Sequence, residues 1–369
     1  MMEIQRRKTR QIHVGALAIG GGAPVSIQSM TKTFTHDVEA TVRQIHALTM
    51  AGCEIVRVAV PDNAAAEAVK AIKPQIHIPL IADIHYDHRL ALIALEGGAD
   101  GIRLNPGNLK EEARIREVVA AAKMHRCAIR VGVNAGSVDA VYPKEGPLRH
   151  EARQAFIQKM VERALGYLSL FEKEGFYDMK VSMKLSNVLD TVTAYRQMAT
   201  LCDYPFHLGV TEAGLPRDSS IKSALGIGAL LLEGIGDTIR VSMTGDPVEE
   251  VEAAKRILQF LELREFGPEL IACPSCGRAD IDLIQLVEKA EKRLKELGST
   301  QKSLTGVKIA LMGCEVNGPG EAKDADIGIA AGKGVGMIFR KGQMVRRVKE
   351  SEMVEALVQE MLSAQNSKP

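Results

Sequence analysis

The sequence predicts an α/β protein, a (β/α)8 TIM barrel followed by a small α/β domain. Short apolar segments alternate with helix-like stretches between residues 25 and 245. Eight such units suit the size of a closed parallel barrel. A module of different composition begins near residues 266–270. The expected domains are therefore residues 1–265 and 266–369. An open doubly wound sheet is the alternative, because the number of units, and no single motif, favours the barrel.

The barrel strands are expected where short apolar runs end in polar residues, at 25–31, 54–60, 79–86, 101–108, 128–137, 179–187, 207–214 and 238–245. The stretches between them have helical spacing, and Asp37 and Asp246 are suitable N-caps. Residues 9–25 resemble a glycine-rich hairpin that could plug the bottom of the barrel. The run Gly20–Gly22 precedes a strand and does not lead into a helix, so a turn is favoured over a phosphate loop.

The second domain starts with the segment IACPSCGRAD. A helix is expected over 281–298, and a closing helix over 351–365. Between them, candidate strands lie at 307–313, 325–332, 335–342 and 343–348. This mixture predicts a small α/β domain.

Composition excludes several classes of function. Lys plus Arg number 47 against 46 Asp plus Glu, a net charge of +1, so no global field favours nucleic acid or a membrane surface. The N-terminus has basic residues without an apolar segment behind them, and a soluble, cytoplasmic protein is expected. Six cysteines are too few for a disulfide scaffold, and Cys53, Cys127 and Cys202 lie in apolar segments typical of buried structural thiols.

The other three cysteines form a candidate metal site. Cys273 and Cys276 form a CxxC pair, and Cys314 returns after a helix and a strand. Three thiolates are one ligand short of a full set, and Glu321, across a Gly-Pro-Gly turn, could supply an oxygen. By residue type alone, structural zinc and an iron–sulfur cluster fit equally well. A thioredoxin-like redox pair fits less well, because the CxxC opens a domain and a third cysteine accompanies it.

The candidate barrel strands carry unusually polar residues toward their carboxyl ends, where barrel enzymes have their active sites. These residues are Arg57, Arg103, Arg130, Asn134, Lys184, Glu212, Arg240 and Ser242. Four buried guanidinium groups need anionic partners, which are either a phosphate-rich ligand or Asp83, Glu54 and Glu212. The ligand is favoured, because the carboxylates are fewer. Lys184 could instead be a Schiff-base nucleophile. A metal on Asp83 and His85 is disfavoured for want of a third ligand.

Together these residues resemble the bacterial two-domain form of the 4-hydroxy-3-methylbut-2-enyl diphosphate synthase family, over essentially the whole chain. The most specific segments are CPSCGR at 273–278 and GCEVNGPGEA at 313–322. Supporting segments are QSMT at 28–31, RLNPGN at 103–108, RVGVNAGS at 130–137, MKLSN at 183–187 and VTEAG at 210–214.

The resemblance implies a reductive dehydration of 2-C-methyl-D-erythritol 2,4-cyclodiphosphate in the methylerythritol phosphate route to isoprenoids. It implies a [4Fe-4S] cluster on Cys273, Cys276, Cys314 and Glu321, with Glu321 giving way to a substrate oxygen. Glu212 would protonate the departing hydroxyl. The diphosphate would be bound by Arg57, Arg103, Arg130, Asn134, Lys184, Arg240 and Ser242. Flavodoxin or ferredoxin would supply electrons, and a head-to-tail homodimer would bring one subunit's cluster domain to the other's barrel.

Two other functions compete with this interpretation. One is a Schiff-base aldolase that uses Lys184 and carries structural zinc in its small domain. The other is an electron-transfer protein built on the cluster domain alone. The strand arginines disfavour the electron carrier, because it needs no substrate pocket.

Overall fold

The computed structural model describes residues 4–85, 87–105, 111–138, 141–143, 149–279, 281–298, 305–314, 323, 325–332 and 334–365. It divides into two compact units, Met1–Arg264 and Glu265–Pro369, and each is described by itself. Across the described residues, no helix is both long and apolar enough to cross a membrane.

The first unit contains the predicted eight-stranded parallel barrel. Its strands follow the order β8-β7-β6-β5-β4-β3-β10-β9, and an isolated parallel bridge between Val181 and Phe206 joins the two ends of this sheet. The strands are β3 (Ser26–Met30), β4 (Ile55–Val60), β5 (Leu80–Ile84), β6 (Gly101–Leu104), β7 (Ala128–Asn134), β8 (Met179–Lys184), β9 (His207–Leu208) and β10 (Thr238–Ile239). Every predicted barrel strand is present. The last two are shorter than expected, so Arg240 lies one residue beyond its strand.

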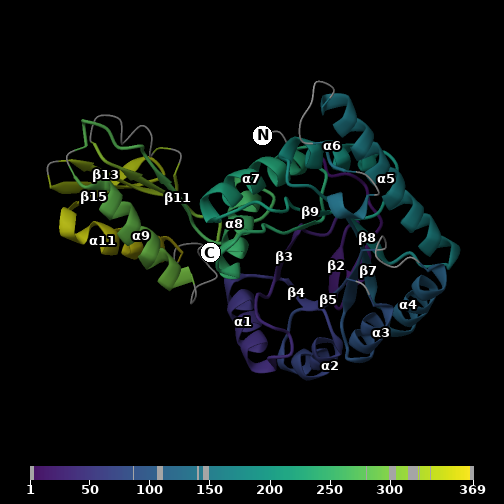
Figure 1. Ribbon diagram of the computed structural model, residues 1–369. Helices are drawn as coiled ribbons and strands as arrows, with labels where there is room; N and C mark the ends of the chain where they lie inside the picture. The colour runs from purple at the N-terminus through teal and green to yellow at the C-terminus, as the bar shows by residue number, and fades with distance from the viewer. Residues whose placement is uncertain are drawn as a thin grey trace. The chain divides into compact units, whose positions relative to one another are not determined.

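A helix follows each strand, and the helices form an outer ring around the sheet (Figure 1). They are α1 (Val38–Ala51), α2 (Asn63–Ile72), α3 (His88–Glu96), α4 (Glu112–His125), α5 (Arg149–Lys173), α6 (Val188–Ala199), α7 (Pro216–Leu232) and α8 (Pro247–Phe260). Short 3-10 turns occur at η1 (Lys73–Gln75) and η3 (Ala135–Ser137). Asp37 and Asp246 cap their helices as predicted, accepting hydrogen bonds from the backbone N–H groups of Ala40 and Val248.

An N-terminal hairpin closes the amino-terminal end of the barrel. It consists of β1 (Ile12–Val14) and β2 (Leu17–Ile19), paired antiparallel. Its apolar side chains pack in one buried cluster with Ile55, Ile81 and Ala128, which lie at or near the first residues of three barrel strands. The predicted plug is therefore confirmed, and it leaves only the carboxyl end of the barrel for a ligand.

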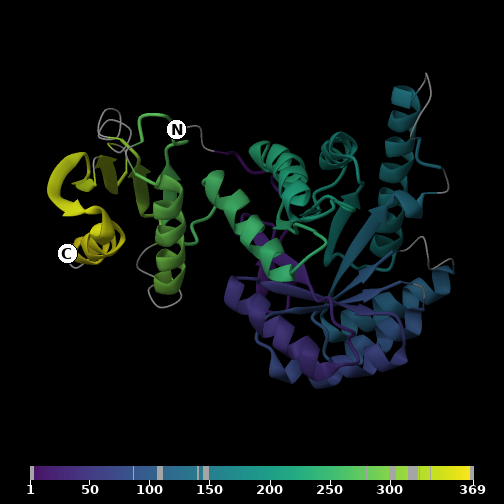
Figure 2. The same cartoon turned by 60° about the vertical axis from the view of Figure 1, so that its left-hand side comes forward.

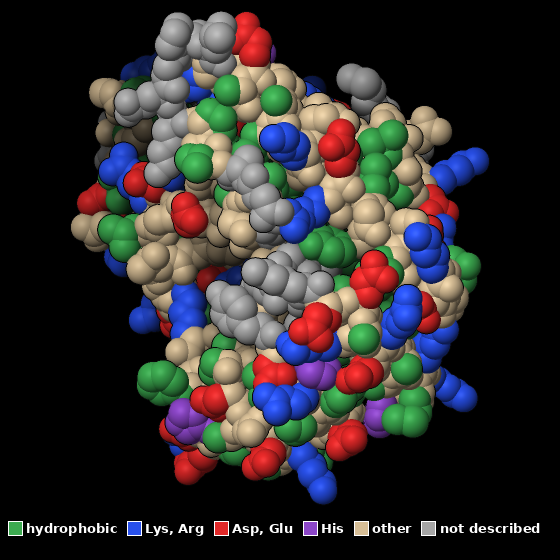
Figure 3. Space-filling view, turned by 45° about the vertical axis from the view of Figure 1, so that its right-hand side comes forward, with side chains coloured by type: hydrophobic (Ala, Val, Ile, Leu, Met, Phe, Trp, Pro, Cys, Tyr) green, Lys and Arg blue, Asp and Glu red, His purple; other side chains and the backbone are tan. Residues whose placement is uncertain are grey.

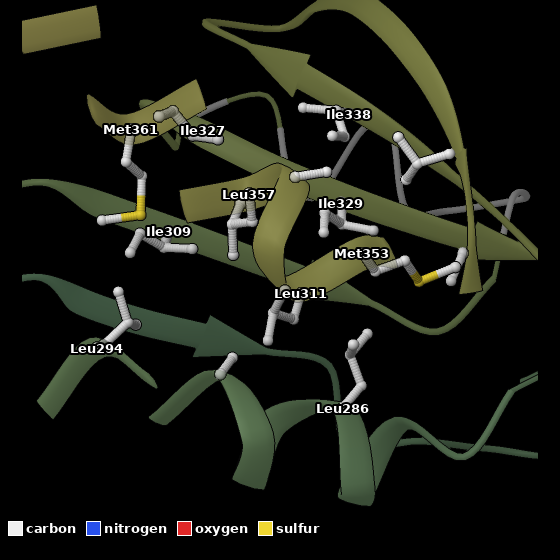
Figure 4. Close-up of a cluster of buried hydrophobic side chains, with 14 of the residues drawn as sticks. Leu286, Leu294, Ile309, Leu311, Ile327, Ile329, Ile338, Met353, Leu357 and Met361 are labelled. Atoms are coloured by element: carbon white, nitrogen blue, oxygen red, sulfur yellow. The ribbon is translucent and has the colours of Figure 1, made fainter. Parts of the chain in front are cut away.

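The second unit is a five-stranded sheet in the order β11-β12-β13-β14-β15 with helices on one face (Figure 2). Its strands are β11 (Glu269–Ala272), β12 (Lys308–Met312), β13 (Ile327–Gly332), β14 (Val335–Arg340) and β15 (Gln343–Lys349). Its helices are α9 (Leu283–Gly298) and α11 (Met353–Gln365), the latter preceded by η5 (Glu350–Glu352). Leu286 and Leu294 of α9 and Met353 and Leu357 of α11 meet one set of alternating strand side chains (Figure 4). The sequence did not predict β11.

Candidate functional site

The basic side chains predicted for the barrel mouth share the barrel interior. Arg57, Arg103 and Arg130 lie on β4, β6 and β7, and Arg240 follows β10. Each guanidinium is largely buried, and Arg130 is only 3% exposed. Gly132 makes room for Arg103, since a Cβ at that position would lie 2.7 Å from its Nε. The strand pattern therefore directs several positive charges into one confined volume.

Two carboxylates face these charges. Asp83 on β5 accepts a hydrogen bond from Nη1 of Arg103 at 3.3 Å and lies 3.6 Å from Nε of Arg57. Glu250 on α8 accepts hydrogen bonds from Ser29 Oγ at 3.0 Å and Arg240 Nε at 3.4 Å. Both carboxylates are nearly completely buried. The sequence predicted Asp83 as a partner but missed Glu250, which lies on a helix.

The disfavoured alternative, in which Glu54 pairs with the strand arginines, is wrong. Glu54 precedes β4 and accepts a hydrogen bond from Nη1 of Arg264 at 2.6 Å and another from the backbone N–H of Ile27. A residue before a parallel strand lies at the opposite end of the barrel from the mouth. Glu54 therefore gives no compensation to the buried arginines.

Several buried donors lack partners within the described residues. They are Nε and Nη1 of Arg130 and Nε of Arg103. Burial, together with Arg57 and Arg103, lowers the pKa of Arg130 well below its usual value, and burial lowers the pKa of Arg57 to about 10. Because guanidinium groups keep their protons in proteins, the unfavourable energy of these charges favours binding of an anion.

The positive charge is internal and is not a property of the whole surface. On the face drawn in Figure 3, Lys and Arg side chains are interspersed with Asp and Glu. The barrel interior instead holds Arg57, Arg103, Arg130, Arg240, Lys180 and Lys184 against the carboxylates Asp83 and Glu250. A local field of this kind selects a compact, highly charged anion.

Lys184 ends β8 and is only half-buried, with its amine beside Gly209, where a Cβ would lie 2.6 Å from Nζ. Burial, followed by the charges of Arg130 and Arg240, lowers the pKa of Lys184 well below its ordinary value. A lowered pKa suits a Schiff-base nucleophile, whereas a bound phosphate would favour the ammonium form of Lys184. The surrounding arginines favour the phosphate contact.

A cavity of about 230 Å³ opens where β7, β8 and β9 end. Asn134, Leu185, Ser186, Thr211 and Glu212 line it. Glu212 is exposed and has a φ of 53°, in the left-handed region that a non-glycine residue rarely occupies. Such backbone strain is concentrated at functional sites. The structure thus brings Asn134 and Glu212, both predicted from the sequence, into one cavity.

One residue that lines this cavity, Tyr142, was not predicted from the sequence. Tyr142 also lines it, and its hydroxyl donates to Asp190 on α6, which also accepts from Arg153 of α5 at 2.7 Å. Burial and the Asp190 carboxylate raise the pKa of Tyr142 to about 12. No local motif marks Tyr142, because its partners come from two distant helices.

Ser242 lies beyond β10 and is half-buried. Its carbonyl oxygen accepts a hydrogen bond from Oγ of Ser219 at 2.7 Å, which fixes the loop to the start of α7.

The carboxylate of Asp83 and Nε2 of His85 lie 3.8 Å apart, and Asp83 already contacts the arginines. Burial opposes ionisation of Asp83, but Arg57 and Arg103 outweigh it and lower the pKa of that carboxyl.

Cys273, Cys276 and Cys314 belong to the second unit. Cys273 and Cys314 follow the adjacent parallel strands β11 and β12, so both lie at the same edge of the sheet. The backbone N–H of Gly313 donates to Sγ of Cys273 at 3.4 Å, and Nε of Arg278 donates to Sγ of Cys276 at 3.4 Å. Hydrogen bonds of this kind stabilise thiolate ligands.

The donor set therefore fits a thiolate-bound metal group, although no group of three or more His, Cys, Asp or Glu side chains is gathered as a metal site among the described residues. Glu321, the predicted oxygen ligand, lies outside the described residues.

Cys53 and Cys127 are buried in the first unit, and burial raises their pKa values to about 12 and about 11, as expected of structural thiols. Cys202 is only partly buried, and burial also raises its pKa.

Comparison with known proteins gives matches to both units. The GcpE TIM-barrel domain matches residues 9–255, and the GcpE protein C-terminal domain matches residues 269–363. A relative from Lawsonia intracellularis is 55% identical over 344 residues, covering 93% of this chain and 92% of its own. One from Geobacter sulfurreducens is 52% identical over 356 residues, covering 96% and 98%. Both are named 4-hydroxy-3-methylbut-2-en-1-yl diphosphate synthase (flavodoxin).

Among solved structures, dihydropteroate synthase from Stenotrophomonas maltophilia is similar to 69% of this chain and 98% of its own, with 12% identity and a TM-score of 0.49. A likeness at that level adds nothing to the assignment. The family models cover both units, and relatives above 50% identity extend over nearly the whole length. The chain therefore belongs to the GcpE family.

Proposed function

We propose that this chain makes the product for which its relatives are named. 2-C-methyl-D-erythritol 2,4-cyclodiphosphate takes up two electrons and two protons, its ring opens, and it loses water to give 4-hydroxy-3-methylbut-2-enyl diphosphate. The protein is thus an oxidoreductase of isoprenoid biosynthesis. The observation that carries the proposal is the buried cluster of basic side chains whose donors outnumber the facing carboxylates, Asp83 and Glu250.

The barrel residues would hold the two phosphoryl groups. Arg57, Arg103, Arg130 and Arg240 supply planar donors that match phosphoryl oxygens. Lys184 adds a point charge at the end of β8, and Asn134 and Ser242 supply neutral contacts at the ends of β7 and β10. Because the hairpin closes the other end of the barrel, the substrate would enter and leave at this mouth.

Glu212 would donate the proton that lets the hydroxyl leave as water. It lies in the cavity beside Asn134, on a loop held by the hydrogen bond from the backbone N–H of Thr211 to the carbonyl of Leu185 at 3.3 Å. Tyr142, anchored to Asp190, would limit the space opposite the carboxyl group. An acid held in one position protonates one position of the substrate.

In the second unit, Cys273, Cys276, Cys314 and Glu321 would hold a [4Fe-4S] cluster. When bound, the cluster would supply the two electrons one at a time. The amide of Gly313 and the guanidinium of Arg278 would stabilise the thiolates of Cys273 and Cys276. The word flavodoxin in the relatives' names supports a flavodoxin as the electron donor, and ferredoxin is the alternative donor. The protein would form a head-to-tail homodimer, in which the cluster domain of one subunit serves the barrel of the other.

The competing aldolase gains no support from the comparisons. The relatives are named for a diphosphate product and a redox partner. Burial and the surrounding arginines account for the lowered pKa of Lys184 without a Schiff-base role.

The test begins with protein prepared without oxygen. It should be brown and contain about four iron and four sulfide per chain. Glu212→Gln should bind the cyclic diphosphate as tightly as wild type but turn it over about 100-fold or more slowly, because general acid catalysis contributes this much. Glu151→Gln, at an exposed position on α5, is the matched control and should leave turnover unchanged. Colourless, zinc-loaded protein would refute the cluster, and normal turnover of Glu212→Gln would refute the assigned acid.

A further inference from the structure

Lys180 is a buried lysine beneath the predicted ligand-binding residues. Along β8 the side chains alternate, so Lys180 and Lys184 point to the same face, with Lys180 four residues nearer the amino end of the strand. It is 1% exposed, and its Nζ has no hydrogen-bond partner in the described part of the chain. An unpaired buried ammonium is strongly unfavourable.

The groups that face Lys180 do not compensate its charge. From β7, its register partner Arg130 repels it. From β9, His207 is fully buried with both ring nitrogens unpartnered within the described residues, and burial, Lys184 and Arg130 lower its pKa so that it stays neutral. Before β10, Asp237 attracts Lys180 but is bonded to Nη2 of Arg6 at 2.9 Å and the backbone N–H of Phe206 at 2.8 Å.

Lysine can respond to this environment in a way that arginine cannot. A guanidinium keeps its proton, whereas a buried amine can lose one. Burial, and then the charge of Arg130, lowers the pKa of Lys180 to about 7. An anion bound to Arg130 would offset the repulsion and restore the ammonium form.

We propose that Lys180 adjusts the charge of the barrel to its contents, being a mixture of amine and ammonium near neutral pH when the barrel is empty and an ammonium when the diphosphate is bound. Substrate binding then draws up to one proton from solvent onto Nζ of Lys180, and product release returns it. Lys180 is a positioning residue, because it acts through Arg130 without touching substrate. This inference rests on the proposed function. The cyclic diphosphate carries one strongly acidic hydroxyl on each phosphorus, so it does not itself titrate near neutral pH.

Calorimetric titration of the full protein with the cyclic diphosphate, in buffers of different ionisation enthalpy, measures the proton uptake. We expect about half a proton per site at pH 7 and about 0.9 at pH 8, and an affinity that falls about 50-fold from pH 7 to pH 9. No uptake by wild type at pH 8 would overturn the inference without any variant. Failure of the ligand to bind at any pH would instead overturn the proposed function.

Lys180→Met keeps the length of the side chain and removes the titrating group. We expect it to bind the diphosphate with at least 0.5 fewer protons taken up at pH 8 than wild type. Lys159→Met, at an exposed position on α5, is the matched control and should retain the wild-type uptake. Undiminished uptake by folded Lys180→Met would assign the proton to another group, such as Lys184, and overturn the inference. If Lys180→Met does not fold, Lys180→Gln is the second variant, and undiminished uptake by it would overturn the inference in the same way.

Discussion

The buried arginines of the barrel differ in the negatively charged partners that they have. Arg130 stays ionised and has two unpartnered donor nitrogens, whereas Arg57 and Arg103 share Asp83. Arg240 relies on Glu250, which comes from a helix. The arginines could be predicted from their places in the sequence, because each lies in or beside an apolar strand. Glu250 could not be assigned to Arg240, because only the packing of α8 in the barrel brings it beside β3.

Asp83→Asn tests the value of the shared carboxylate. The change leaves Arg57 and Arg103 without a negative partner, so we expect the free energy of unfolding at pH 7 to fall by about 3–5 kcal/mol in urea titrations. Inorganic pyrophosphate should stabilise this variant more than wild type. Asp87→Asn removes a partly exposed carboxylate paired with Arg89, retains an N-capping side chain, and should change stability by about 1 kcal/mol or less. Equal losses in both variants would contradict the buried pairing.

Asp83 also predicts how the stability of the fold depends on pH. The pKa of Asp83 is lowered in the folded protein, so the ionised carboxylate stabilises the fold above the ordinary Asp range near about 4. That stabilisation is lost as the pH falls through the lowered value, and Asp83→Asn should lack this part of the acid transition.

At the scale of elements, the alternation of side chains along each strand explains most of the site. One face of β7 carries Arg130, Gly132 and Asn134, and the same face of β8 carries Lys180 and Lys184. The same period of two along the sequence places Lys180 on the face of Lys184, in the barrel interior. The period also excludes Glu54 as a partner of Arg57, because the two lie three residues apart and so on opposite faces. In contrast, β11 is a short edge strand with partly exposed side chains, and its pairing with β12 defines it more than its own sequence does.

Gly132→Ala tests how closely two barrel strands fit. The added Cβ would lie 2.7 Å from Nε of Arg103, so either the strand or the guanidinium must shift. We expect a loss of about 1–3 kcal/mol in stability and weaker binding of the cyclic diphosphate by calorimetry. Gly166→Ala places a methyl on α5 where nothing lies within 4 Å, and should leave binding unchanged with stability equal or higher by up to about 1 kcal/mol. Unaltered binding by Gly132→Ala would show that Arg103 does not need its present position.

At the scale of the whole molecule, the two units have separate cores and carry different parts of the proposed chemistry. The barrel holds the basic residues and Glu212, while the cysteines lie at one edge of the second sheet. The sequence could predict both folds, because each depends on local patterns of apolar residues. It could not predict how the parts meet, since the head-to-tail arrangement rests on resemblance alone.

Mixing two inactive variants tests that arrangement. Glu212→Gln disables the barrel site and Cys276→Ser removes a cluster ligand, so each variant alone should show almost no turnover. If the cluster unit of one subunit serves the barrel of the other, a mixed dimer contains one fully intact pair. Co-expression in equal amounts should then restore about a quarter of wild-type turnover, because half of the dimers are mixed and each has one working site of two. If each cluster served its own barrel, both pairs in the mixed dimer would be broken. Turnover no higher than that of the separate variants would therefore exclude the head-to-tail arrangement.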